Sequence, residues 1–339
     1  MAKNTYAIPT TEPEFEELVE EAFLKYRAKG FPHYFLTPEE KFKNLTQLRH
    51  YSHSNLIVDG NILQKMHGLS LAWSYFPHSW SVQCGSMKTP LDVFNSDKDF
   101  RGAIAKHVMY RSEIITDAAI RRAVRSYSGA QGVSNFRPTA AAAIYHAFLP
   151  TTGGSVWDMS SGFGGRLLGA IACDHVSRYV GTDPCTQTMT GLRTMARELG
   201  RDGLEIELQE IGSENFLPDC NEFDLCFSSP PYFDTEKYSN ESTQSYLTFR
   251  NKEAWLCGFL GTTLDNCWCG LKPNGRLIIN LANVTSYPTL EEDFVRMACS
   301  RGWRLERKLR YSLSRMMGTR RPEGDRFKYE PVFVFEKKP

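Results

Sequence analysis

The stretch Asp158-Met-Ser-Ser-Gly-Phe-Gly-Gly-Arg166 decides the predicted fold of this 339-residue chain. It follows a short apolar run that begins at Ser155, and a helical pattern from Leu167 to Cys173 comes after it. Glycines at such a strand-to-helix junction let the backbone pass close to a ligand and adopt torsions that a Cβ would forbid. In doubly wound sheets this junction, at the carboxyl end of the first strand, is where nucleotide-like ligands bind. The glycines alone are equally compatible with an ordinary tight turn.

A second acidic residue, Asp183, ends the next predicted strand. A carboxylate at this position can accept hydrogen bonds from both hydroxyls of a ribose. The glycines are spaced G-x-G-G, unlike the G-x-G-x-x-G of a pyrophosphate site, and Asp158 precedes them. Because a carboxylate repels a pyrophosphate but suits the cationic amino-acid end of S-adenosylmethionine, the pattern favours this methyl donor over a nicotinamide dinucleotide. The predicted cofactor-binding residues are Asp158, Ser160, Gly162, Phe163, Gly164, Gly165, Asp183 and Pro184, with Ser213 placed beside the adenine unless its turn is merely polar.

From about residue 153 onward, short apolar runs alternate with helical patterns. Such alternation predicts a parallel sheet with helices on both faces. We therefore predict a Rossmann-like α/β fold whose mostly parallel, seven-stranded sheet has an antiparallel edge strand. The expected strands are 155–158, 179–183, 204–211, 223–229, 276–281, 304–311 and 332–336, and the expected helices are 167–173, 186–199, 255–271 and 290–301.

The N-terminal part of the chain has a different texture. Residues 14–29 place apolar side chains on one helix face, and Thr37-Pro-Glu-Glu is typical of a helix start with proline at the first helical position. We predict a mainly helical region over residues 1–130, for target recognition or oligomerisation, and a catalytic domain over residues 131–339. The oligomeric state itself is not indicated.

The composition limits the class of protein. Apolar residues make up 41% and charged residues 23%, as in ordinary globular proteins, and the net charge is only +1. Binding to a polyanion would therefore need local clusters of charge. The nine cysteines show no paired C-x-x-C spacing, which favours reduced thiols over a metal site. No apolar run has membrane-spanning length and no signal peptide opens the sequence, so we predict a cytoplasmic protein without membrane or metal.

The most specific pattern is Ser229-Pro230-Pro231-Tyr232, directly after the fourth predicted strand. The two prolines fix φ and donate no backbone hydrogen bonds, so they freeze a loop whose carbonyl oxygens have no amide donors beside them. The Ser229 side chain and the Pro230 carbonyl could then hold the two hydrogens of a planar amino group and aim its lone pair at a methyl sulfonium. Tyr232 offers a ring on which an extruded base can stack. We assign the catalytic role to Ser229, Pro230, Pro231 and Tyr232, with positioning supplying most of the rate.

In this order, Asp158 to Arg166, Asp183 and Ser229-Pro-Pro-Tyr232 resemble the amino-methyltransferases of DNA, including those of bacteria and phages, over about residues 130–339. The resemblance implies methyl transfer from S-adenosylmethionine to the exocyclic amino group of a flipped base. In that family serine is commoner in enzymes acting on N4 of cytosine, and aspartate or asparagine in those acting on N6 of adenine. Cytosine is therefore favoured, and adenine stays open. Asn135-Phe136-Arg137-Pro138 resembles the segment over the methionine end of the cofactor, which adds Phe136 and Pro138 to the cofactor-binding set.

The sequence departs from the family in the spacing of its motifs. Only 67 residues (229 − 162) separate Gly162 from Ser229, which leaves no room between them for a target-recognition domain. Target reading would then fall to the N-terminal half. Neither the recognition sequence nor a restriction partner is indicated.

Two segments could contact nucleic acid. Residues 301–328 contain ten basic and three acidic residues, a net charge of +7, and their central part has the composition of a loop. A cationic loop near the strand ends would attract phosphates, although a merely solvated face fits the same pattern. Residues 233–250 could form a lid over the base, although their aromatic residues could equally belong to the core. The predicted DNA-binding residues are Arg315, Arg320, Arg321, Lys237 and Tyr238.

Other functions compete with this prediction. Cys185 follows Pro184, as in enzymes that methylate carbon 5 of cytosine through a cysteine nucleophile. However, it follows the second strand and so faces the cofactor rather than the substrate. The two-acceptor chemistry also serves RNA or a glutamine amide in a protein. A catalytically inactive, nucleic-acid-binding subunit is a further alternative, against which both intact motifs argue.

Overall fold

The computed structural model describes residues 11–63, 65–111, 115–315 and 327–337, and the side chains of residues 111, 314, 315 and 327 lie outside this description. The chain forms two compact units. The larger contains Leu36–Phe76, Asn135–Thr235 and Ser239–Pro339, and the smaller contains Met1–Phe35, Pro77–Ser134 and Glu236–Tyr238. We expected a single boundary near residue 130. The structure instead gives residues 36–76 to the larger unit.

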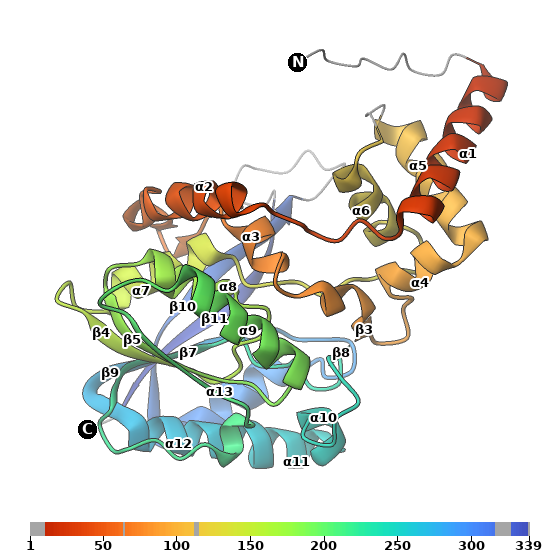
Figure 1. Ribbon diagram of the computed structural model, residues 1–339. Coiled ribbons are helices and arrows are strands. Elements are labelled where there is room, and N and C mark those ends of the chain that lie inside the picture. The colour runs from red at the N-terminus through yellow and green to blue at the C-terminus, as the bar shows by residue number, and fades with distance from the viewer. Residues whose placement is uncertain (1–10, 64, 112–114, 316–326, 338–339) are drawn as a thin grey trace. The chain divides into compact units, whose positions relative to one another are not determined.

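The larger unit is built on a mixed sheet in the order β1-β2-β10-β11-β9-β7-β4-β5-β6 among the described residues (Figure 1). β4, β5, β6, β7 and β9 run parallel to one another, whereas β11 runs antiparallel to both β9 and β10. The strands are β1 Ile57–Val58, β2 Asn61–Ile62, β4 Gly154–Asp158, β5 Val176–Thr182, β6 Glu205–Gln209, β7 Phe223–Ser228, β9 Leu271–Asn280, β10 Trp303–Arg315 and β11 Phe327–Lys337.

This sheet confirms the predicted Rossmann-like α/β class and differs from the prediction in two details. The antiparallel strand β11 is not at the edge, because it pairs on one side with β9 and on the other with β10. Among the described residues, the sheet also has two strands more than the seven expected. β1 and β2 form a small hairpin, and β2 pairs in parallel with β10 through Asn61 and Ile62. Ile62 is fully buried there, which explains why this segment belongs to the sheet.

Helices cover both faces of the sheet. α7, α8 and α9 lie on one face, and α12 and α13 lie on the other (Figure 1). The second face packs on a core that includes Trp157, Phe223, Trp255, Phe294 and Phe335. The helices of this unit are α2 Pro38–Arg49, α3 Leu69–Trp73, α7 Pro138–Phe148, α8 Gly165–Ala172, α9 Thr186–Leu199, α10 Ser245–Thr248, α11 Lys252–Ala254, a π-helical segment Trp255–Gly261, α12 Thr262–Gly270 and α13 Leu290–Ser300.

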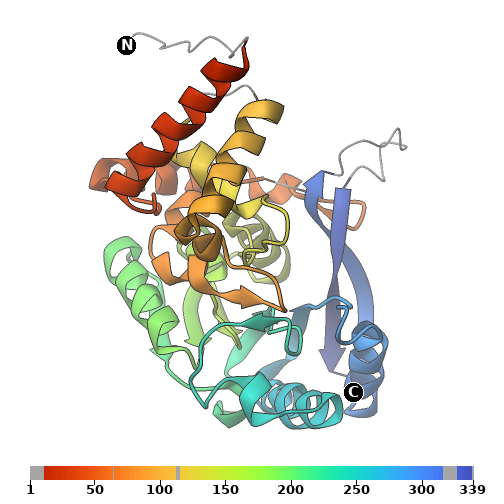
Figure 2. The same cartoon turned by 90° about the vertical axis from the view of Figure 1, so that its right-hand side faces the viewer.

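The smaller unit is mainly helical, as predicted for the N-terminal region (Figure 2). α1 buries Val19, Ala22, Phe23 and Tyr26 on the predicted face, and these pack with side chains of α5 and α6. Its elements are α1 Glu12–Lys29, β3 Gln83–Cys84, α4 Pro90–Asn95, α5 Asp97–Arg111, α6 Asp117–Arg125 and β8 Glu236–Lys237, with β3 and β8 paired antiparallel.

The helix start predicted at Thr37 is confirmed in the larger unit. Thr37 caps α2, since its side chain accepts a hydrogen bond from the backbone of Glu40 while the Glu40 side chain accepts one from the backbone of Thr37. Pro38 occupies the first helical position, where its missing N–H costs nothing. No helix in the described part of the chain combines the length and the apolar character needed to cross a bilayer.

Candidate functional site

The glycine-rich turn joins β4 to α8 and is shaped by backbone demands that only glycine meets easily. Gly162 and Gly164 have φ values of 54° and 69°, in the left-handed region that favours glycine. A Cβ at Gly165 would lie 1.8 Å from the carbonyl oxygen of Phe136. The segment at Asn135 and Phe136 therefore crosses directly over the turn, and the Asn135 amide secures it by donating to the Phe163 carbonyl at 2.8 Å.

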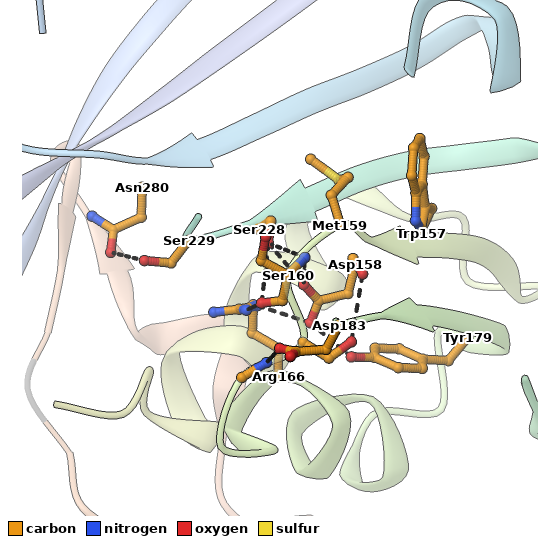
Figure 3. A network of polar contacts seen from close by, with 12 residues as sticks. Trp157, Asp158, Met159, Ser160, Arg166, Tyr179, Asp183, Ser228, Ser229 and Asn280 are labelled. Atoms are coloured by element: carbon orange, nitrogen blue, oxygen red, sulfur yellow. Dashed lines mark hydrogen bonds and ion pairs between the residues drawn. The ribbon is translucent and has the colours of Figure 1, made fainter. Parts of the chain in front are cut away.

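Asp158, at the end of β4, is fully buried and already paired within the protein (Figure 3). Its Oδ2 accepts hydrogen bonds from Arg166 Nε at 2.8 Å and from the Tyr179 hydroxyl at 2.7 Å. Its Oδ1 accepts one from the Ser228 hydroxyl at 2.9 Å. We predicted that this carboxylate would face the cationic end of a ligand. The structure gives it an internal role instead, because an arginine neutralises its charge.

Ser228 connects the glycine turn to the end of β7. Besides donating to Asp158, its hydroxyl oxygen accepts a hydrogen bond from the Ser160 backbone N–H at 3.0 Å. β4 and β7 are parallel neighbours, so their carboxyl ends lie at the same edge of the sheet. Ser229 follows directly, and Figure 3 shows it beside this network. The structure thus brings the two predicted motifs together.

Asp183, just after β5, has a carboxylate with spare acceptor capacity. Its Oδ2 accepts from the Gly162 N–H at 2.9 Å and its Oδ1 from the Cys185 N–H at 3.0 Å. An ionised carboxylate has about four lone-pair sites, so acceptor positions remain on both oxygens. Burial raises the pKa of Asp183 to about 6, and the two N–H groups partly oppose this shift.

The Ser229–Tyr232 loop is held by two polar residues from neighbouring strands. The Ser229 hydroxyl donates to Asn280 Oδ1 at 3.3 Å, and the Tyr232 hydroxyl donates to Glu330 Oε2 at 3.0 Å. Asn280 ends β9 and Glu330 lies on β11. Sequence reasoning missed both. A signal existed for Asn280, since it is a polar residue ending an apolar strand, as Asp183 does.

Three of the predicted cofactor-binding side chains point into the protein interior. Phe163 packs against Trp73 and Phe76, with ring centroids 5.4 and 5.8 Å apart. The Phe136 ring stacks on Tyr311 at 4.6 Å. Ser213 is buried and shares a 2.8 Å hydrogen bond with Thr263.

The backbone of the Phe136 segment still crosses the glycine turn, and Pro138 begins α7 from a buried position. Next to Ser213, Glu214 is half-buried, and burial raises its pKa. This acidic side chain is the better candidate for a ligand contact after β6. The prediction had named Ser213 of the same turn instead.

Two further predicted features surround Asp183. The Pro184 carbonyl accepts a hydrogen bond from Thr243 at 3.3 Å, and the Glu241 carboxylate accepts from the Thr186 N–H at the start of α9. Part of the proposed lid, residues 239–250, therefore lies against this corner of the site. The Cys185 thiol is buried and burial raises its pKa, the opposite of what activates a nucleophile.

The structure does not test the residues predicted to contact nucleic acid. Lys237 and Tyr238 belong to the smaller unit. Arg320, Arg321 and the side chain of Arg315 lie outside the described residues. Several described cations of the 301–328 segment have acidic partners that the sequence did not suggest, such as Arg304 with Glu336 and Lys308 with Glu291.

Several solved structures are similar to this chain in fold. A TehB-like SAM-dependent methyltransferase from Corynebacterium glutamicum aligns with a TM-score of 0.38 and 17% identity over 60% of this chain and 90% of its own. A ribosomal protein L11 methylase from Lactobacillus delbrueckii aligns with a TM-score of 0.37 and 15% identity over 61% of this chain and 81% of its own. A SAM-dependent O-methyltransferase from Thermotoga maritima aligns with a TM-score of 0.40 and 10% identity over 61% of this chain and 68% of its own. No protein-family model and no curated protein sequence matches the chain.

Replacing Arg166 by methionine tests whether its ion pair with Asp158 holds the site together. The substitution leaves a buried carboxylate without its cation, so we expect the free energy of unfolding to fall by about 3–5 kcal/mol in urea denaturation. Arg193→Met is the matched control, since Arg193 pairs with Glu210 while half exposed, and it should cost less than about 1 kcal/mol. Equal losses in the two variants would contradict the assigned role.

Proposed function

We propose that this protein is an S-adenosylmethionine-dependent methyltransferase that acts on the exocyclic amino group of a flipped base in DNA, with N4 of cytosine favoured over N6 of adenine. The observation that carries the proposal is the hydrogen-bonded contact of Ser228 with Asp158 and Ser160. It sets the Ser229–Tyr232 loop beside the glycine turn, where a methyl donor and an amino group must meet.

The residues around the turn fit the proposed cofactor. The Asp183 carboxylate has unused lone pairs for ribose hydroxyls, and the turn at Gly162 offers backbone in a conformation that approaches a ligand closely. Glu214 would contribute on the adenine side. When bound, S-adenosylmethionine supplies an electrophilic methyl group on a sulfonium.

The loop fits an amino acceptor. Ser229 is partly exposed, and Pro231 has no backbone N–H. No amide hydrogen of Pro231 therefore competes for the Ser229 oxygen or the Pro230 carbonyl, so both can accept hydrogen bonds from a substrate. Two such acceptors can hold both hydrogens of a planar NH₂ group. In the transfer the nitrogen lone pair would form the N–C bond, the donor sulfur would keep the electron pair of the broken C–S bond, and one amino hydrogen would leave as a proton to water.

The acceptor is tested directly with labelled methyl donor. We expect label on DNA, with lower transfer to RNA and to protein, and N4-methylcytosine on digestion and mass analysis. N6-methyladenine would redirect the assignment within the same chemistry. Label on RNA or on protein glutamine with none on DNA would overturn the choice of DNA.

Single substitutions should separate the loop from the cofactor site. Ser229→Ala removes one acceptor and is expected to lower kcat by roughly 10²-fold, with cofactor affinity by calorimetry changed by less than about a factor of two. Tyr232→Ala should likewise lower kcat with little change in cofactor affinity. Tyr232→Phe should lower kcat less, because the aromatic ring remains. Asp183→Ala should weaken cofactor binding by roughly tenfold or more.

The control for the serine is Ser300→Ala. The Ser300 hydroxyl donates within α13 to the Met297 carbonyl, far along the chain from either motif. The Ser300→Ala substitution should leave both kcat and cofactor affinity unchanged. If the loop and Asp183 variants all weakened cofactor binding alike, the division of roles would be wrong.

The raised pKa of Asp183 predicts a pH dependence of cofactor binding. Above its value of about 6 the carboxylate is charged and accepts ribose hydroxyls, whereas below it the protonated group is a poorer acceptor. Affinity should therefore be full well above pH 6 and fall as the pH drops through about 6. Asp183→Asn should bind more weakly with a flat profile over this range. A profile in the wild-type protein as flat as in the variant would exclude Asp183 from the contact.

A further inference from the structure

Asn280 is a buried carboxamide that contacts the loop proposed to hold the substrate. It is the last residue of β9 and only 2% exposed. Its Oδ1 lies 3.3 Å from the Ser229 hydroxyl, a contact drawn in Figure 3. Its Nδ2 donates to the Pro331 carbonyl at 3.0 Å. One side chain thus joins β11 to the loop.

The contacts of Asn280 fix which way its amide faces. The Pro331 carbonyl oxygen can only accept, so the NH₂ end must point toward it. The flipped amide would set two oxygen acceptors against each other. The oxygen of the amide therefore faces Ser229.

This orientation decides the role of the Ser229 hydroxyl. Oδ1 of Asn280 cannot donate, so the hydroxyl must direct its single proton at Asn280. Its lone pairs are left for another partner. If the proton pointed instead at a substrate amino nitrogen, it would occupy the lone pair that has to attack the methyl group.

We propose that Asn280 is a positioning residue that holds the Ser229 hydroxyl as a hydrogen-bond acceptor toward the substrate amino group. The inference rests on the proposed function for its catalytic meaning. The orientation itself is testable without any substrate.

The orientation can be read from a thiol placed at the serine position. In Ser229→Cys, the acceptor oxygen of Asn280 favours the neutral thiol over the thiolate. Alkylation of this cysteine by iodoacetamide is measured as a function of pH by peptide mass analysis. Adding Asn280→Ala should lower the midpoint of this pH profile. From the net contribution of a typical hydrogen bond, we expect the acid dissociation constant of the thiol to change by roughly fivefold. The midpoint pH depends on the ionisation of the thiol and not on its accessibility, whereas the alkylation rate depends on both.

The sign of this shift decides the matter. An amide that donated to position 229 would stabilise the thiolate, so its removal would raise the midpoint. An unchanged or raised midpoint overturns the proposal. Asn280→Asp serves as a second variant of nearly the same size, and it keeps an acceptor, so its midpoint should not fall. Thermal melting of each variant verifies the fold.

The catalytic consequence is tested by a double-mutant cycle. Asn280→Ala should lower kcat by roughly fivefold to tenfold with little change in KM. In the Ser229→Ala background the same change should cost nothing further, because Asn280 acts through that hydroxyl. An equal loss in both backgrounds would make Asn280 a structural residue only. A wild-type protein inactive on every base would overturn the proposed function, while the thiol midpoint would still report the amide orientation.

Discussion

The buried ion pair between Asp158 and Arg166 is the interaction on which the site depends. A carboxylate removed from water is tolerated only when it is paired and its lone pairs are hydrogen-bonded. Here the partners come from three elements, since Arg166 is on α8, Tyr179 on β5 and Ser228 on β7. Satisfying one charge therefore fixes the start of a helix, the middle of β5 and the end of β7 around the glycine turn.

The direction of the strands explains which polar groups meet at the site. β4, β5, β7 and β9 are parallel and end at one edge of the sheet, so the residues at or just after their ends, Asp158, Asp183, Ser228 and Asn280, gather there. β11 runs the other way and passes this edge early in its course. That reversal brings Glu330 to Tyr232 and the Pro331 carbonyl to Asn280. The antiparallel strand thus completes the support of the loop.

Much of the fold could be predicted because its signals are local. The glycines between β4 and α8, the cap at Thr37 and the alternation of strands and helices each depend on a few neighbouring residues. The hairpin of β1 and β2 could not be predicted in the same way. Its strands have two residues each and show no periodicity, and its partner β10 lies far along the chain. Only tertiary pairing makes this segment part of the sheet.

The sequence located the candidate residues at the ends of strands but did not indicate the directions of their side chains. Asp158 and Asp183 carry the same signal in the sequence, an acidic residue ending an apolar strand, yet they have different surroundings. Asp158 is next to a buried arginine that neutralises it, whereas Asp183 has backbone N–H donors and no ion-pair partner among the salt bridges of the described residues. Because an arginine eight positions along the chain reaches back only once α8 has formed, the sequence alone does not distinguish the two. A buried carboxylate held by N–H groups alone keeps lone pairs for a ligand, and this is why we propose Asp183, rather than Asp158, as the group that binds the ribose.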